Sequence, residues 1–364
     1  FADLEVCDDG IDNDRQLAEA LNAEPFVRLD PELIADSEAF GVYAPATPEL
    51  FPHVESMFAG MLDAALESEV SHHMVGMLRH GNEINKHGHI KDLTALLGPD
   101  YESLPYIGFF NQEAHDILAS QLWFYLRLGT RDAWQYLQRR ARCARDMVTV
   151  WHHDVPEYMG LQRRHSMYPW SNISTSHTVM RGLHGYHLLT GDSRARRAVL
   201  HASASSLLDW WSEFGLFGKY KSLQPSWSGL VGTTLRGHTA LWLNLMLGYG
   251  YTKNGAYLEV IESFKELLLS LQLEQGSFPS SIYLAESGGF NASPAVGYDH
   301  SLMHSLETHH ALFGTAEVAG AIQALADAGV LVDSQGSLEF SQSPYYAVEA
   351  LAYFSNGFSP LSLV

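Results

Sequence analysis

Residues 168–192 read YPWSNISTSHTVMRGLHGYHLLTGD. A polar and aromatic entry is followed by a helix-like run from His177 to Leu189, and a Thr-Gly-Asp turn ends the run. Apolar residues three and four apart predict a helix with a buried face, and glycine is common just past a helix end. This stretch therefore predicts the first helix of a hairpin, followed by a tight turn.

The same layout recurs along the chain. In each copy a histidine or arginine precedes a glycine by 14 residues: His115 and Gly129, His177 and Gly191, Arg236 and Gly250, His300 and Gly314. The first members of these pairs are 62, 59 and 64 residues apart. A period near 60 residues, with two helices in each period, predicts an array of helical hairpins.

The expected fold is all-α, an (α/α) toroid of repeated hairpins over residues 51–364, preceded by an acidic, irregular segment over residues 1–50. A toroid is favoured over an open solenoid because the first helix of each hairpin is apolar nearly all round and needs cover on both sides. Four hairpins and flanking helices are visible, whereas a full six-hairpin ring is not. The paired helices are expected at 111–128 and 132–150, 177–189 and 193–213, 233–249 and 255–272, and 299–312 and 315–329.

Charge and composition exclude several classes of protein. The net charge is −20, and residues 1–70 hold 17 acidic residues against Arg15 and Arg28. Nucleic-acid binding needs a basic footprint, so no nucleic-acid partner is expected. No apolar run reaches the roughly 18–20 residues that span a bilayer, so no membrane span is expected. Cys7 and Cys143 are too far apart in sequence to form a zinc motif.

The segment CDDGIDND, residues 7–14, resembles the start of a calcium loop. Asp8, Asp12 and Asp14 would supply carboxylate oxygens to a hard cation. The residues that follow supply no further loop ligands, and an acidic turn that caps a helix is the competing interpretation. No cofactor is required by the sequence, and calcium is the one ion that it indicates.

The candidate site residues gather at the starts of the first helices and in the loops before them. His115, Tyr168 and His177 are expected to transfer protons. The expected substrate contacts are Asn111, Glu113, His165, Trp170, Asn172, Arg181, Trp227, Arg236, Tyr298 and His300. Asn111 and His115 are four residues apart, as are His177 and Arg181, so each pair is expected to share a helix face.

These residue types suit elimination at a uronic acid. Aromatic faces cover the C–H surface of sugar rings, while arginine and asparagine bind the uronate carboxylate. Neutralising that carboxylate acidifies the neighbouring C–H, so a histidine or tyrosine base removes the proton and a second such group protonates the leaving oxygen. The pattern therefore favours a polysaccharide lyase acting on an acidic polysaccharide or oligosaccharide.

Other basic residues are expected to be structural. His184, His187 and His201 are predicted to be packing or surface residues. For His238 a place in the core and a place in the site are equally expected. Four arginines between positions 139 and 145 are expected on an outer, solvated face because they are spread around a helix.

Two segments resemble a known family. FFNQEAHDILASQLWFYLRLGTRDAWQYLQRRARCARDM (109–147) and SHTVMRGLHGYHLLTGDSRARRA (176–198) are similar to the exo-acting rhamnogalacturonan lyases and their YetA-like relatives. The resemblance implies an (α/α) toroid, usually joined to β-domains, and elimination at a uronic acid. This chain departs from that pattern because no β-sandwich is obvious before or after the helices.

Two rival functions remain. A glycoside hydrolase on an (α/α) barrel would need two carboxylates about 5–10 Å apart, and Glu113, Asp116 and Asp299 are candidates. A non-catalytic glycan-binding or extracellular assembly protein is the other alternative. No signal-like stretch is apparent, so an extracellular or periplasmic location is inferred from the expected substrate.

Overall fold

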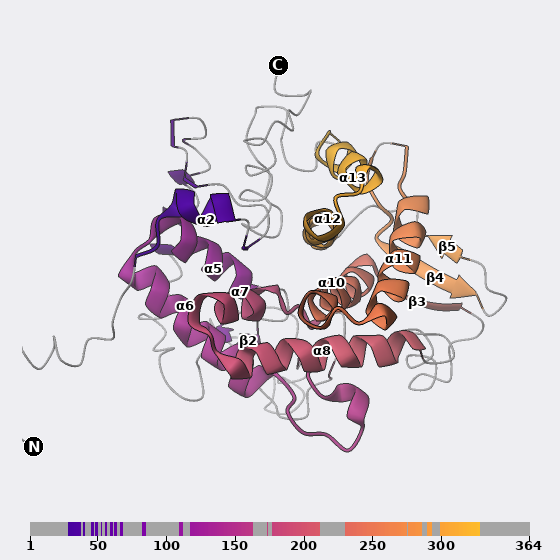
Figure 1. The fold of residues 1–364 in the computed structure, drawn as a ribbon, viewed down its shortest axis with the longest axis horizontal. Helices are drawn as coiled ribbons and strands as arrows, with labels where there is room; N and C mark the ends of the chain where they lie inside the picture. Colours follow the sequence, from indigo (N-terminus) through magenta and orange to yellow (C-terminus); the bar gives the residue numbers. More distant parts are fainter. Residues whose placement is uncertain are drawn as a thin grey trace, which may run out of the picture.

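The computed structural model describes residues 28–37, 39–40, parts of 45–67, 82–84, 109–111, 117–162, 173, 177–211, 230–274, 276–285, 290–292 and 299–327. These residues are mainly helical, which confirms the predicted class (Figure 1). None of the described helices is both long and apolar enough to cross a membrane.

Within the described part of the chain, four hairpins follow one another (Figure 1). They are α5 (Ile117–Leu128) with α6 (Arg131–Cys143), α7 (Arg181–Thr190) with α8 (Ser193–Trp211), α10 (Leu235–Thr252) with α11 (Gly255–Ser270), and α12 (Asp299–Phe313) with α13 (Ala316–Asp327). The first helices α5, α7, α10 and α12 contact one another in that order. The second helices α8, α11 and α13 do the same, so the chain builds two layers of helices.

Each hairpin turns over two residues, and the first of them has a left-handed backbone. The φ angles are 59° at Gly129, 70° at Gly191, 54° at Lys253 and 62° at Gly314. These positions are 62, 62 and 61 residues apart, so the repeat is more regular than the histidine and arginine spacing indicates. In the first three hairpins the second turn residue caps the following helix. The side chains of Thr130, Asp192 and Asn254 each accept a backbone N–H group there.

The predicted turn of the third hairpin is wrong. Gly250 was expected to end the first helix, but α10 continues to Thr252 and the chain turns at Lys253. The residue 14 positions before that turn is Thr239, so Arg236 is not the repeat equivalent of His177. Glycine is the residue that most readily adopts a left-handed backbone, but at this turn a lysine adopts it.

Two small antiparallel sheets accompany the described helices, and neither was predicted. β1 (Asn82–Ile84) pairs with β2 (Phe109–Asn111), while β3 (Leu230–Thr234), β4 (Ser281–Ala285) and β5 (Phe290–Ala292) form the second sheet in that order. β3 leads directly into α10. The second sheet therefore lies beside the start of α10, which it contacts.

Two helix starts also differ from the prediction. α5 begins at Ile117, and Asn111 lies in β2, where it pairs with Asn82. Asn111 therefore does not share a helix face with His115. α7 begins at Arg181, so His177 precedes the helix instead of lying on its first turn.

The segment predicted to be irregular contains one described helix. α2 (Pro31–Ser37) contacts α5 and buries Ile34 in the core. The carboxylate of Asp30 accepts the backbone N–H groups of Glu32 and Leu33, which caps the helix. The proposed boundary at residue 50 stays a prediction.

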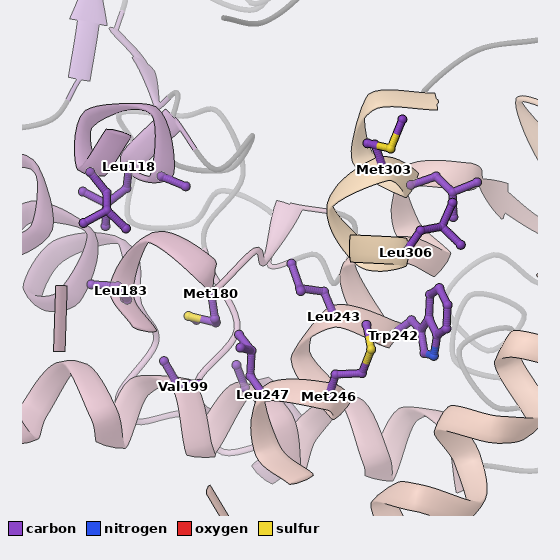
Figure 2. Close-up of a cluster of buried hydrophobic side chains, with 14 of the residues drawn as sticks. Leu118, Met180, Leu183, Val199, Trp242, Leu243, Met246, Leu247, Met303 and Leu306 are labelled. Atoms are coloured by element: carbon purple, nitrogen blue, oxygen red, sulfur yellow. The ribbon is translucent and has the colours of Figure 1, made fainter. Parts of the chain in front are cut away.

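One continuous hydrophobic core joins the hairpins (Figure 2). It receives Leu118 from α5, Leu183 from α7, Val199 from α8, Trp242 from α10 and Leu306 from α12. α10 is enclosed over most of its length, since every residue from Gly237 to Gly248 is buried. Each fully buried Leu side chain contributes about 1.5–3 kcal/mol, so packing around α10 holds the layers together.

Gly182 allows α5 and α7 to pack closely. A Cβ atom at Gly182 would lie 2.7 Å from the backbone nitrogen of Ala119. The Gly182→Ala variant is therefore expected to lower the free energy of unfolding by about 1–3 kcal/mol, as measured by urea denaturation. Gly250→Ala is the matched control, because a Cβ there meets no atom within 4 Å. In a helix this change is expected to stabilise by up to about 1 kcal/mol, and equal effects at both positions would contradict the packing argument.

Candidate functional site

His177 and Arg236 meet where the chain enters α7 and α10. The Nη2 atom of Arg236 lies 3.2 Å from Nε2 of His177. His177 is 1% exposed, whereas Arg236 is partly exposed. A guanidinium has no acceptor atom, so it donates and Nε2 accepts. The contact therefore requires a neutral imidazole that carries its proton on Nδ1.

The backbone next to His177 is held in place by two other parts of the chain. The side chain of Asn244 on α10 donates to the carbonyl of Thr178 over 2.8 Å. The hydroxyl of Thr178 accepts the backbone N–H of Gln162, also over 2.8 Å. Ser203 on α8 donates to the carbonyl of Asn244. These buried hydrogen bonds fix the entry to α7, and with it the position of the imidazole.

Arg181 lies at the centre of a second polar group. Its Nη1 atom contacts Nδ1 of His304 and lies 3.3 Å from the Glu307 carboxylate. The guanidinium also stacks over the ring of Trp123, at 5.5 Å from its centroid. The group links α7 to α12 and to α5. Among the first helices, α10 contacts both α7 and α12 and so lies between them. Contact across an intervening helix is consistent with a curved layer of first helices.

His304 and Glu307 were not among the sequence candidates. Arg181 and His304 each lie ten residues before the turn of their hairpin, so they occupy equivalent repeat positions. Alignment of the hairpins on their left-handed turn residues would have paired them. Arg181 was predicted to hold a substrate carboxylate, but in the structure it contacts the carboxylate of Glu307.

His238 belongs to the core. It is fully buried on α10, with its ring 5.8 Å from that of Phe264. Burial lowers the pKa of His238 from its ordinary 6.5 to about 3, and a hydrogen bond with the backbone of Ile282 opposes that shift only in part. The side chain is therefore neutral and ties β4 to α10.

Because His238 is buried in its neutral form, we expect the folded protein to lose stability in acid. The pKa of His238 is lower in the folded than in the unfolded state. The neutral side chain therefore contributes its full stabilisation of the folded state above about pH 6.5, and this contribution is lost as the pH falls towards 3. At pH 5 the free energy of unfolding is expected to be about 2 kcal/mol lower than at pH 7 from this residue. Urea denaturation across this range should give a shallower pH dependence for His238→Asn. The exposed His152→Asn is the control, and an identical slope in both variants would refute the assignment.

The remaining histidines of this region pack against aromatic side chains, as expected. Nδ1 of His184 lies 2.7 Å from the Tyr251 hydroxyl, and burial lowers the pKa of His184 to about 4, with further lowering by His187 and Arg181. The ring of His201 lies 6.0 Å from that of Trp151. These contacts tie α7 to α10 and α8 to the segment around Trp151.

The expectation that Arg139, Arg140, Arg142 and Arg145 are solvated is wrong for two of them. Arg140 is buried and donates to the Tyr136 hydroxyl one helical turn earlier. Arg145 pairs with Asp146 and with Asp192 in the second turn. The helical spacing of Tyr136, Leu137 and Arg140 puts Arg140 on the buried face of α6, and side-chain pairing across hairpins engages Arg145.

The other predicted residues are not placed. Outside the described residues lie Asp8, Asp12, Asp14, Glu113, His115, Asp116, His165, Tyr168, Trp170, Asn172, Trp227 and Tyr298. Asn111, Asp299 and His300 are described in their backbone alone, with Asp299 and His300 at the start of α12. Among the described side chains, no group of three or more His, Cys, Asp or Glu residues is arranged to hold a metal ion.

The described candidate site thus consists of the His177–Arg236 pair and the polar group around Arg181. No family model matches the chain and no curated protein is significantly similar to it, so its function has to be inferred from its own residues.

Proposed function

We propose that the chain is a polysaccharide lyase that cleaves a uronic-acid-containing polysaccharide by β-elimination. In this proposal the hairpins form an (α/α) toroid, and the loops before the first helices build the substrate site at an extracellular or periplasmic location. The observation that carries the proposal is the contact between His177 and Arg236, because it combines a neutral imidazole with a cation that binds carboxylates.

The two side chains suit the two requirements of elimination. The guanidinium of Arg236 has five N–H donors in a planar fork that matches a carboxylate. A substrate carboxylate is a stronger acceptor than imidazole, so it would draw the guanidinium away and release Nε2 of His177. Nε2 would then remove the proton from the sugar carbon that bears the carboxylate.

The electron pair of that C–H bond forms the new C4–C5 double bond as the bond from C4 to the leaving oxygen breaks. A general acid returns a proton to this oxygen, and His115 and Tyr168 remain the predicted candidates. Arg236 takes the role of neutralising the carboxylate, because its guanidinium lies beside the proposed base, whereas the guanidinium of Arg181 contacts the carboxylate of Glu307. The predicted contacts from Asn111 and Asn172, and stacking on Trp170, Trp227 and Tyr298, complete the proposed site.

A polysaccharide panel tests the reaction type. The full chain is incubated with rhamnogalacturonan, ulvan, alginate and glucuronan, with and without calcium. Elimination gives an unsaturated uronate that absorbs in the ultraviolet, in step with new reducing ends. Reducing ends without that absorbance would contradict the lyase and indicate hydrolysis through Glu113, Asp116 or Asp299. Binding without either product would indicate a non-catalytic glycan-binding protein.

A further inference from the structure

The third hairpin turn carries a lysine where the other three turns carry glycine. Lys253 has φ 54°, a backbone conformation that side-chain-bearing residues rarely adopt. Glycine at this position would relieve the strain, as it does at Gly129, Gly191 and Gly314. Strained residues of this kind often mark functional positions. Folding alone therefore does not explain Lys253.

Lys253 belongs to one of two cation–aromatic pairs at the end of α10. Its Nζ atom lies 5.1 Å from the centre of the Tyr249 ring, and the guanidinium of Arg196 lies 5.3 Å from that of Tyr251. Both cations are exposed and both tyrosines are partly exposed. The contact of His184 with the Tyr251 hydroxyl holds that ring in place. Arg197, also exposed, follows Arg196 near the start of α8.

The stretch of sequence that carries Arg196 and Arg197 has a net charge opposite to that of the whole protein. Residues 131–199 hold 11 arginines and 5 acidic residues, a net charge of +6 in a chain of net charge −20. A local positive field attracts a polyanion. The acidic remainder of the chain repels duplex DNA, whose charge density is higher than that of a carboxylated glycan.

We propose that Arg196, Arg197, Tyr249, Tyr251 and Lys253, here named the turn-end strip, bind a carboxylate-bearing polysaccharide outside the His177–Arg236 pair. The partly exposed tyrosine rings would contact sugar C–H surface, while the arginines and the lysine would bind carboxylates. The choice of ligand rests on the proposed lyase function. The strip would hold a long chain while another segment of it is cleaved.

Two double variants of the full chain test the strip, with alginate as the probe in calorimetric titrations at low salt. Arg196→Ala with Arg197→Ala is expected to weaken alginate binding about tenfold, because both charges contact the ligand. Arg131→Ala with Arg142→Ala is the matched control, since it removes the same charge from exposed positions on α6. The affinity of this control variant for alginate is expected to change less than about twofold. Equal losses would overturn the strip, and so would displacement of alginate by an equal charge of duplex DNA.

Lys253→Gly separates binding from folding. This variant is expected to melt at a higher temperature, because the strain is relieved, and yet to bind alginate more weakly. Unchanged affinity would overturn the role of Lys253. Binding that depends on the strip, in a protein that makes no unsaturated product, would leave the strip standing and reject the lyase. Unsaturated product from a protein whose alginate affinity is unchanged by Arg196→Ala, Arg197→Ala and Lys253→Gly would reject the strip and leave the lyase standing.

Discussion

Replacing Glu307 by alanine is expected to lower the free energy of unfolding by about 3–5 kcal/mol. The Glu307 side chain is 1% exposed and lies 3.3 Å from the guanidinium of Arg181, which is itself nearly buried. Its removal takes away the carboxylate that lies beside a nearly buried guanidinium, so the cost of desolvating that charge is less well compensated. Urea denaturation at pH 7 measures the loss.

A double variant distinguishes the charge from the packing. Arg181→Met with Glu307→Leu removes both charges and keeps most of the volume, so it is expected to recover most of the lost stability. A loss below about 1 kcal/mol in Glu307→Ala would instead be typical of a solvated surface pair. That result would contradict the burial of the polar group between α7 and α12.

Replacing His177 by glutamine is expected to reduce kcat by about 10²–10⁴-fold on any polysaccharide that the chain cleaves. The amide oxygen of glutamine still accepts from Arg236 but cannot take up the substrate proton. KM is expected to change little, because the carboxylate contact from Arg236 remains. Initial rates of unsaturated-product formation, measured over a range of substrate concentrations, separate the two parameters.

The control for this experiment is His201→Gln on the same hairpin. His201 contacts Trp151 and lies outside both the proposed proton-transfer pair and the turn-end strip. Near-equal melting temperatures for wild type and His177→Gln would show that the fold is retained. Arg236→Lys is expected to raise KM because lysine keeps the charge but loses the planar fork. Wild-type kcat in His177→Gln would reject His177 as the base.

Local sequence patterns predict most of the hairpin architecture. Helix α12 was expected over 299–312 and is observed at Asp299–Phe313, because its apolar spacing and the following glycine are both local signals. The strands were missed because their pairing is not local: Leu230 pairs with Ala285. The short segment that forms β3 carries no periodicity by itself. Lys253 was missed because no rule of composition predicts a left-handed lysine.

The candidate site was predicted only in part. His177 and Arg236 were both singled out, but on a repeat register that the structure does not keep, and their contact was not foreseen. Arg181 was expected to face substrate, whereas Glu307 on a distant hairpin contacts it. Pairing between helices separated by more than a hundred residues depends on how the layers pack, which the spacing of residues within one helix does not encode.

A comparison of wild type, His177→Gln and His201→Gln on the polysaccharide that wild type degrades, with ultraviolet absorbance and reducing ends followed together, tests whether His177 is the base. If it is, wild type and His201→Gln form unsaturated product at similar rates, and His177→Gln is slower by about 10²–10⁴-fold. Unsaturated product formed equally fast by His177→Gln, or reducing ends formed without unsaturated product, would contradict elimination by His177.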